Sequence, residues 1–254
     1  RNNSSYEIRP ENFGSTRREI LDRFIYNLDR TEVEALKTFS IARFYTDEIF
    51  VYLCHEFNLG LSRSEFGDFN RYSFISKQGV KYFLHTLMRD GLIFYIDGEY
   101  KRAVHESLSS FYENKIINSN VESQESLTEF LSEATFHKRN CVDRETFLSW
   151  INKDKITLFR DLQLTGNSRF LLDYLASLYN DFGQDRISQE VFIIYIDMLH
   201  LSGQFIAAAE MIQDFLSKYD FDTIITSNIL LHLYIRAIHH QMFYMPVKPL
   251  IDCM

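Results

Sequence analysis

The chain has 254 residues, 46% of them hydrophobic, and its 27 lysines and arginines against 35 aspartates and glutamates give a net charge of −8. This length allows one or two domains with a hydrophobic core, and the acidic balance argues against general nucleic-acid binding, which needs a basic face for the phosphates. Only 9 glycines and 3 prolines occur, and no proline lies between Pro10 and Pro246. Because turns need glycine and proline, we expect an all-α fold with one small β-hairpin.

The cysteines and the apolar runs of the sequence indicate the cellular compartment in which the protein is expected. The 3 cysteines, Cys54, Cys141 and Cys253, are odd in number and far apart, so they form neither a CxxC metal pair nor a disulfide framework. No apolar run approaches about 18 residues, and we therefore expect no membrane span. Reduced thiols in a cytoplasmic protein fit this pattern. The chain begins at Arg1 instead of methionine, which is consistent with a segment of a longer protein.

The first part of the chain is expected to hold short helices. Residues 1–16 are predicted to form an irregular arm, and two T/S-x-x-E capping boxes, Thr31 with Glu34 and Ser62 with Glu65, predict helix starts. Apolar residues at helical spacing predict helices over residues 17–29, 31–39, 47–57, 62–69 and 76–90.

The β-hairpin is predicted over residues 92–104. Leu92 to Ile96 form a β-like apolar run, and Asp97-Gly98 follows it, which is a strong signal for a tight hairpin turn. Helices that are closed by a hairpin make a winged helix. We therefore expect a helical, winged-helix-like domain over residues 17–116.

Residues 117–254 are predicted to form an α-solenoid of helix pairs that resemble tetratricopeptide repeats. Gly203 before Ala207-Ala208-Ala209 is typical of the tight turn and close packing within such a pair, and a second turn at Ile238 would lie 35 residues further on. The expected helices lie near residues 105–116, 123–138, 143–153, 155–164, 168–181, 188–201, 204–218 and 224–240.

His105 is the first candidate for a functional residue. It lies in Val104-His105-Glu106, where the predicted hairpin would end and the next helix would begin. A helix N-terminus presents unpaired N–H groups and favours phosphate, and a histidine there adds a side-chain donor. Taken alone, a histidine that merely caps the helix is the commoner explanation.

The region from Glu19 to Tyr112 resembles the segment that follows the nucleotide-binding domain in STAND signalling ATPases, the NB-ARC and NACHT class. In that family a winged helix ends in a Met-His-Asp-like motif, which Val104-His105-Glu106 would match with another apolar residue and with glutamate for aspartate. The resemblance implies that His105 contacts a phosphate of ADP bound to an upstream domain and holds a resting state. Leu84-His85-Thr86 is the second candidate, inside the helix predicted over residues 76–90.

The resemblance implies a non-catalytic role for this chain. No G-x-x-x-x-G-K-[ST] phosphate loop occurs, so ADP or ATP would belong to the upstream nucleotide-binding domain, and we expect no enzyme activity and no cofactor in the chain itself. The helical repeats would recognise a protein trigger, with oligomerisation on activation and a possible place in antiviral defence. No metal site is expected, because adjacent residues such as His239-His240 or Cys54-His55 point about 100° apart on a helix.

Two other functions are compatible with parts of the sequence. A single-stranded RNA-binding protein of the pentatricopeptide kind is favoured by the 35-residue spacing and opposed by the charge of −8. A DNA-binding winged helix would use residues 76–90 as its recognition helix, with Lys77, Gln78, Lys81 and Arg89 as contacts. The acidic composition argues against both.

Overall fold

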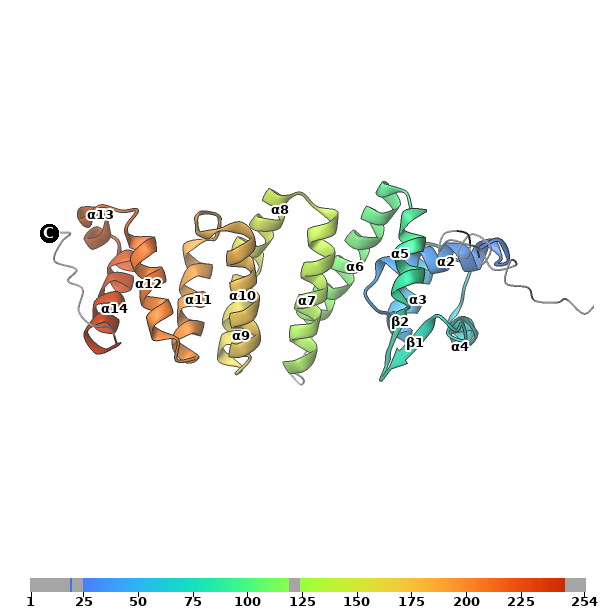
Figure 1. Ribbon diagram of the computed structural model, residues 1–254, viewed down its shortest axis with the longest axis horizontal. Coiled ribbons are helices and arrows are strands. Elements are labelled where there is room, and N and C mark those ends of the chain that lie inside the picture. The colour runs from blue at the N-terminus through green and yellow to red at the C-terminus, as the bar shows by residue number, and fades with distance from the viewer. Residues whose placement is uncertain (1–18, 20–24, 119–123, 245–254) are drawn as a thin grey trace, which may run out of the picture. The chain divides into compact units, whose positions relative to one another are not determined.

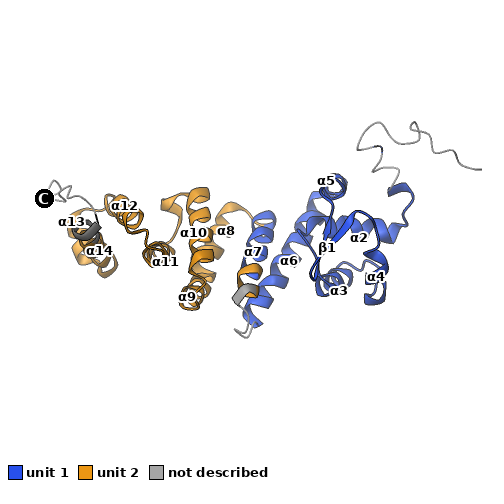
Figure 2. Cartoon of the chain, turned by 60° about the horizontal axis from the view of Figure 1, so that its bottom comes forward, with its two compact units in different colours: residues 1–118, 130–141 blue, residues 119–129, 142–254 orange. Residues whose placement is uncertain are grey.

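The computed structural model describes residues 19, 25–118 and 124–244. The chain divides into two compact units, residues 1–118 with 130–141 (unit 1) and residues 119–129 with 142–254 (unit 2), as Figure 2 shows. The described residues are mostly helical and contain one two-stranded antiparallel sheet (Figure 1), which confirms the expected helical fold with one hairpin. The arm predicted over residues 1–16 and most of the helix predicted over 17–29 fall outside the described residues.

Unit 1 alternates short helices with a hairpin and ends in two longer helices. A 3₁₀ turn, Arg63–Glu65, precedes α4, and the residues of α7 from Phe130 onward belong to this unit. Its elements are α2 (Arg30–Ile41), α3 (Asp47–Glu56), α4 (Phe66–Phe69), β1 (Ile75–Gln78), β2 (Lys81–Leu84), α5 (Thr86–Phe94), α6 (Gly98–Asn118) and α7 (Gln124–Cys141).

One of the two predicted capping boxes is present. The Ser62 and Glu65 box is confirmed at the 3₁₀ turn before α4. The box predicted from Thr31 and Glu34 is wrong, because α2 begins two residues earlier. There the Asp29 carboxylate accepts from the Glu32 backbone at 2.7 Å, and the Glu32 carboxylate accepts from the Asp29 backbone at 3.0 Å.

The hairpin lies about twenty residues before its predicted position. Residues 76–90, predicted as a helix, instead contain both strands of the hairpin and the start of α5. Gly79 allows the turn with φ at 61°, in the left-handed region. Tyr45 and Tyr82 add an isolated antiparallel bridge, in which each backbone N–H donates to the other residue's carbonyl, at 2.9 and 2.8 Å.

The Asp97-Gly98 pair, predicted as the hairpin turn, instead begins a helix. The Asp97 carboxylate accepts from the backbone N–H groups of Glu99 at 2.8 Å and Tyr100 at 3.2 Å. This contact satisfies two of the unpaired N–H groups at the start of α6, which is what an N-terminal cap does. The prediction of a hairpin over residues 92–104 is therefore wrong.

An aromatic cluster forms the core of unit 1 and joins α2, α3 and α4. The fully buried Phe39 ring stacks on Phe50 with 5.2 Å between centroids and packs against Tyr45 at 4.7 Å and Phe69 at 5.3 Å. The Tyr45 hydroxyl donates to the Asn70 side chain at 2.7 Å, so its buried polar group is paired.

Unit 2 consists of helices that pack on their neighbours along the chain. The predicted helices between residues 143 and 218 are confirmed with small shifts at their ends, and a π-helical turn, Trp150–Asp154, follows the first of them. The helix predicted over 224–240 is instead two helices with a break at Ser227, and the predicted turn at Ile238 is wrong because a helix runs through it. The helices are α8 (Arg144–Ser149), α9 (Ile156–Leu164), α10 (Ser168–Phe182), α11 (Gln189–Leu201), α12 (Phe205–Leu216), α13 (Phe221–Thr226) and α14 (Asn228–Tyr244).

The pairs α9–α10 and α11–α12 repeat each other at a spacing of 37 residues. Their turns contain Gly166 and Gly203, with φ at 82° and 76°. Helices α9 and α10, α10 and α11, α11 and α12, and α9 and α11 are all in contact. Buried positions of the first pair recur in the second at the same spacing: Phe159 and Ile196, Leu162 and Leu199, Leu171 and Ala208, Leu172 and Ala209, Leu175 and Ile212, Leu178 and Phe215.

Candidate functional site

His105 lies in the interior of α6 and not at a helix start. Its side chain is buried, with 3% of the residue exposed, and its Nδ1 lies 2.8 Å from Nδ1 of His137 on α7. The sequence-based expectation that His105 follows a strand and opens a helix is therefore wrong. What the structure brings together instead is a histidine pair 32 residues apart in sequence, which no local pattern could indicate.

The histidine pair belongs to a chain of polar groups that runs from the buried His137 and Glu133 to the partly exposed Arg43. The fully buried His137 ring stacks on Tyr112 at 6.0 Å, and its Nε2 lies 3.9 Å from the Glu133 carboxylate. The Arg43 guanidinium donates to both carboxylate oxygens of Glu133, from Nε at 3.1 Å and from Nη2 at 2.5 Å. Arg43 also lies over the Phe136 ring, 4.7 Å from its centroid. This network fastens the loop after α2 to α7.

Both histidines of the pair are neutral near pH 7. Burial and, to a smaller extent, the nearby Lys101 charge lower the pKa of His105 to about 4. Burial likewise lowers the pKa of His137 to about 2, assisted by His105 and Arg43. Desolvation disfavours the imidazolium form, so each ring carries one N–H.

The tautomers follow from the Glu133 charge. An N–H at Nε2 of His137 faces the Glu133 carboxylate favourably, whereas a lone pair there would face a negative charge. With that tautomer His137 accepts at Nδ1 from the Nδ1–H of His105. His105 then presents an acceptor at Nε2.

The histidine pair does not have the geometry of a metal site. Zinc lies about 2.0–2.1 Å from each imidazole nitrogen at tetrahedral angles, which requires a nitrogen separation well above the 2.8 Å seen here. In the part of the chain that the structure describes, no three histidine, cysteine or acidic residues are placed to hold a metal ion. The two histidines are therefore joined directly by a hydrogen bond.

His85, the second candidate, lies at a strand-to-helix junction, which is the position that was expected for His105. It follows β2 directly and is the N-terminal cap of α5, where its Nδ1 accepts from the Leu87 backbone at 3.4 Å. Its own backbone N–H donates to the Phe74 carbonyl at 2.7 Å, which ties the end of β2 to the segment before β1. The side chain is exposed. A strand, a histidine and a helix start thus occur together at His85.

Other sequence candidates do not form sites. Cys54 is a free, buried thiol whose pKa burial raises to about 12, so it is unreactive. The neighbouring His55 is exposed, and Asp252 and Cys253 fall outside the described residues. The recognition helix suggested over residues 76–90 is absent, because most of that range forms the hairpin.

Comparisons with known proteins add no precedent for either histidine. No described helix is both long and apolar enough to cross a bilayer. No family model matches the chain, and no curated protein or solved structure shows significant similarity to it.

Proposed function

We propose that residues 30–84 form a winged-helix-like domain. The order of elements supports this: α2, the bridging residue Tyr45, α3, α4 and the β1–β2 hairpin follow one another. In such a domain a short strand after the first helix pairs with the second strand of the hairpin, and Tyr45 pairs with Tyr82 of β2. The wing is then the turn at Gly79, about twenty residues earlier than the sequence pattern indicated.

In this proposal the chain is the non-catalytic regulatory portion of a STAND ATPase, and His85 takes the role first assigned to His105. The carrying observation is that His85 directly follows the last hairpin strand and caps the next helix. Leu84 and Thr86 then occupy the apolar and third positions of the family's motif, with a hydroxyl in place of the carboxylate. His85 is exposed and can reach an upstream domain, whereas His105 is 3% exposed and engaged with His137.

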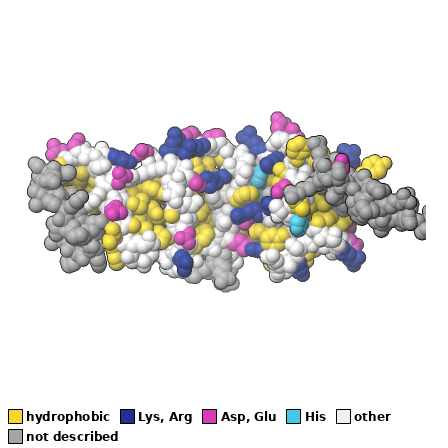
Figure 3. All heavy atoms as spheres, in the orientation of Figure 1, with side chains coloured by type: hydrophobic (Ala, Val, Ile, Leu, Met, Phe, Trp, Pro, Cys, Tyr) yellow, Lys and Arg dark blue, Asp and Glu magenta, His cyan; other side chains and the backbone are white. Residues whose placement is uncertain are grey.

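The helix pairs of unit 2 are the proposed binding surface for a protein trigger. Leu164 and Leu201, at equivalent positions of the two repeats, are 83% and 64% exposed. Figure 3 shows hydrophobic side chains gathered over the middle helices of unit 2, with acidic and basic groups interspersed. Exposed apolar side chains at repeated positions suit recognition of a protein surface. Trigger binding would release the ADP-bound state and allow oligomerisation, as in defence proteins of this class.

The test uses the full-length protein with the upstream nucleotide-binding domain that the proposal requires. His85→Ala should lose retained ADP and become active without a trigger, while His55→Ala, an exposed histidine on α3, should behave as the parent. His105→Gln should lower stability without raising basal activity. Retention of ADP by His85→Ala, or a parent reading frame that encodes no phosphate loop upstream, would refute the proposal.

An RNA-binding helical repeat is the second candidate. The 37-residue recurrence of α9–α10 in α11–α12 is compatible with a pentatricopeptide-like array. Residues 142–244, however, hold 13 acidic and 8 basic side chains, which opposes phosphate binding. A salt-sensitive gel shift with single-stranded RNA would favour this candidate over the protein-binding one.

A further inference from the structure

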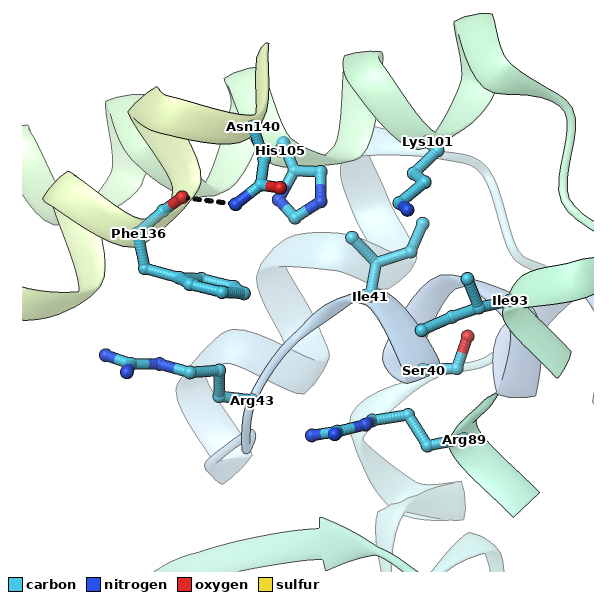
Figure 4. A pocket seen from close by; sticks show the side chains of 9 residues that line it. All are labelled: Ser40, Ile41, Arg43, Arg89, Ile93, Lys101, His105, Phe136 and Asn140. Carbon is cyan, nitrogen blue, oxygen red and sulfur yellow. Dashed lines mark hydrogen bonds between the residues drawn. The ribbon is translucent and has the colours of Figure 1, made fainter. Parts of the chain in front are cut away.

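A pocket of about 200 Å³ lies in unit 1 beside the buried histidine pair (Figure 4). Its cationic side chains come from three places in the fold: Arg43 follows α2, Arg89 lies on α5 and Lys101 lies on α6, which also contributes the neutral His105 ring. Apolar side chains, including Ile93, and the polar Ser40 and Asn140 form the rest of the wall, and no carboxylate is among the described residues that line it. Figure 4 shows Lys101 on one side and the two arginines on the other.

The positive charge of this pocket is only partly balanced. Arg43 is paired with Glu133, which compensates its charge and fixes the guanidinium. Among the described residues, Arg89 has one carboxylate within 4 Å, that of the adjacent Asp90 at 3.6 Å, and the Asp90 side chain is 62% exposed. The Lys101 side chain makes no ion pair or hydrogen bond with the described residues, whereas its backbone N–H donates to the Asp97 carbonyl at 2.9 Å. Arg89 and Lys101 therefore leave a positive potential in the pocket.

The Lys101 charge acts inside the pocket and not only at its rim. It lowers the pKa of the buried His105, so the ammonium group is close enough to the ring to disfavour a second positive charge there. Apolar walls reduce screening by water, which strengthens any charge interaction within the pocket. An anion between Lys101 and Arg89 would balance the positive charge of both side chains.

We propose that the pocket binds the phosphate group of a small molecule. Two cations on opposite walls, with Arg43 held rigidly beside them, suit the several oxygen atoms of a phosphate. Ligand pockets for drug-sized molecules measure roughly 300–1,000 Å³, so this smaller volume admits a phosphate group and leaves the remainder of a larger ligand outside. The pocket is built wholly from unit 1 and does not depend on an upstream nucleotide-binding domain.

The test is a calorimetric titration of the full chain with inorganic phosphate at constant ionic strength. We expect saturable binding to one site, weakened about tenfold by Lys101→Gln and by Arg89→Gln, each of which removes one charge-assisted contact. Lys153→Gln, at an exposed lysine of unit 2, is the matched control and should bind as the parent does. Circular dichroism confirms that each variant is folded.

A second titration with adenosine monophosphate distinguishes the sources of the phosphate. Tighter binding than inorganic phosphate, with the same loss in Lys101→Gln, assigns the pocket to phosphate monoesters. Tighter binding of inorganic phosphate assigns it to the free ion. The proposal is overturned if neither ligand binds saturably, or if Lys153→Gln weakens binding as much as Lys101→Gln and Arg89→Gln do.

Discussion

Acidification is expected to destabilise unit 1 through the buried His105–His137 pair. Folding holds both rings neutral, with the pKa of His105 at about 4 and that of His137 at about 2. In the unfolded chain a histidine has a pKa near 6.5. The unfolded state therefore binds more protons below pH 6.5. The contribution of the pair to stability is complete above pH 6.5 and is lost as the pH falls from there, down to about 4 for His105 and about 2 for His137.

The size of the effect follows from the shift of the His105 pKa. At pH 5 an unfolded histidine is about 1.5 pH units below its pKa and is protonated, while folded His105, with its pKa at about 4, remains neutral. At about 1.4 kcal/mol per unit, this difference lowers the free energy of unfolding by about 2 kcal/mol relative to pH 8. His137 shifts in the same direction, so the pair together should lose at least this amount.

Urea unfolding followed by circular dichroism at pH 8, 6.5 and 5 measures this loss. The His105→Gln/His137→Gln variant lacks both titrating rings and should show a smaller change between pH 8 and 5 than the parent. His55→Gln is the control and should retain the full pH dependence. A parent whose stability is equal at pH 8 and 5, or a double variant with the same pH dependence as the parent, would show that the reasoning is incorrect. Histidine ring-proton NMR of His105→Gln supplies a second readout, because the remaining His137 signal should not titrate between pH 8 and 5.

Three further changes test the packing described above. Glu133→Gln removes the charge that holds Arg43 and should lower the free energy of urea unfolding by about 1–2 kcal/mol; an unchanged value would show that the ion pair contributes nothing. Phe39→Ala empties the centre of the aromatic cluster and should cost about 3–5 kcal/mol, seen as loss of the unit 1 transition while the Trp150 fluorescence transition of unit 2 persists. Gly203→Ala places a side chain at a φ of 76° and should lower the melting temperature, at a cost of about 1 kcal/mol. Gly98→Ala, in a helix with open space around it, should leave the melting temperature unchanged or raise it; equal effects of the two alanines would contradict the role of the turn.

Helices α9 to α12 could be predicted from sequence because each is long enough to show its apolar period, and some helices of unit 2 begin at a recognisable side-chain cap. Ser188, for example, accepts from the Val191 backbone at 3.3 Å, as a serine before an apolar helix is expected to do. The repeat spacing was harder to identify. Leucines of α10 correspond to alanines of α12, so the sequences of the two pairs differ although the buried positions agree.

The hairpin could not be located because its strands are four residues long, too short to establish an alternating pattern. Phe83, Leu84 and Leu87 are spaced as on a helix, although the first two lie on β2. The Asp-Gly signal misled for a physical reason: aspartate is favoured both in tight turns and at helix N-termini, and only the helical residues after Gly98 separate the two.

The candidate site was predictable in part. The sequence singled out His85 and His105 but placed each in the wrong local structure, and their ranking followed from the misplaced hairpin. The contacts of His105 with His137, and of Arg43 with Glu133, depend on how α7 packs on the rest of unit 1. Those residues are 32 and 90 positions apart, beyond the reach of any local pattern.

The sequence separation of these contacts has a consequence for synthesis of the chain. Hydrogen bonds that join different helices of unit 2 link residues that are fairly close in sequence. Gln163 and Asp197 are 34 positions apart, and Asp197 and Arg236 are 39 apart. In unit 1, by contrast, the hydrogen bond between Arg43 and Glu133 links residues that are 90 positions apart. The α2–β2 segment of a nascent chain leaves the ribosome well before α7 and should fold first. Contacts between the two form later still, because contacts across longer sequence separations form more slowly. The buried histidine pair can then form only once α7 has left the ribosome, which makes it one of the last parts of unit 1 to be completed.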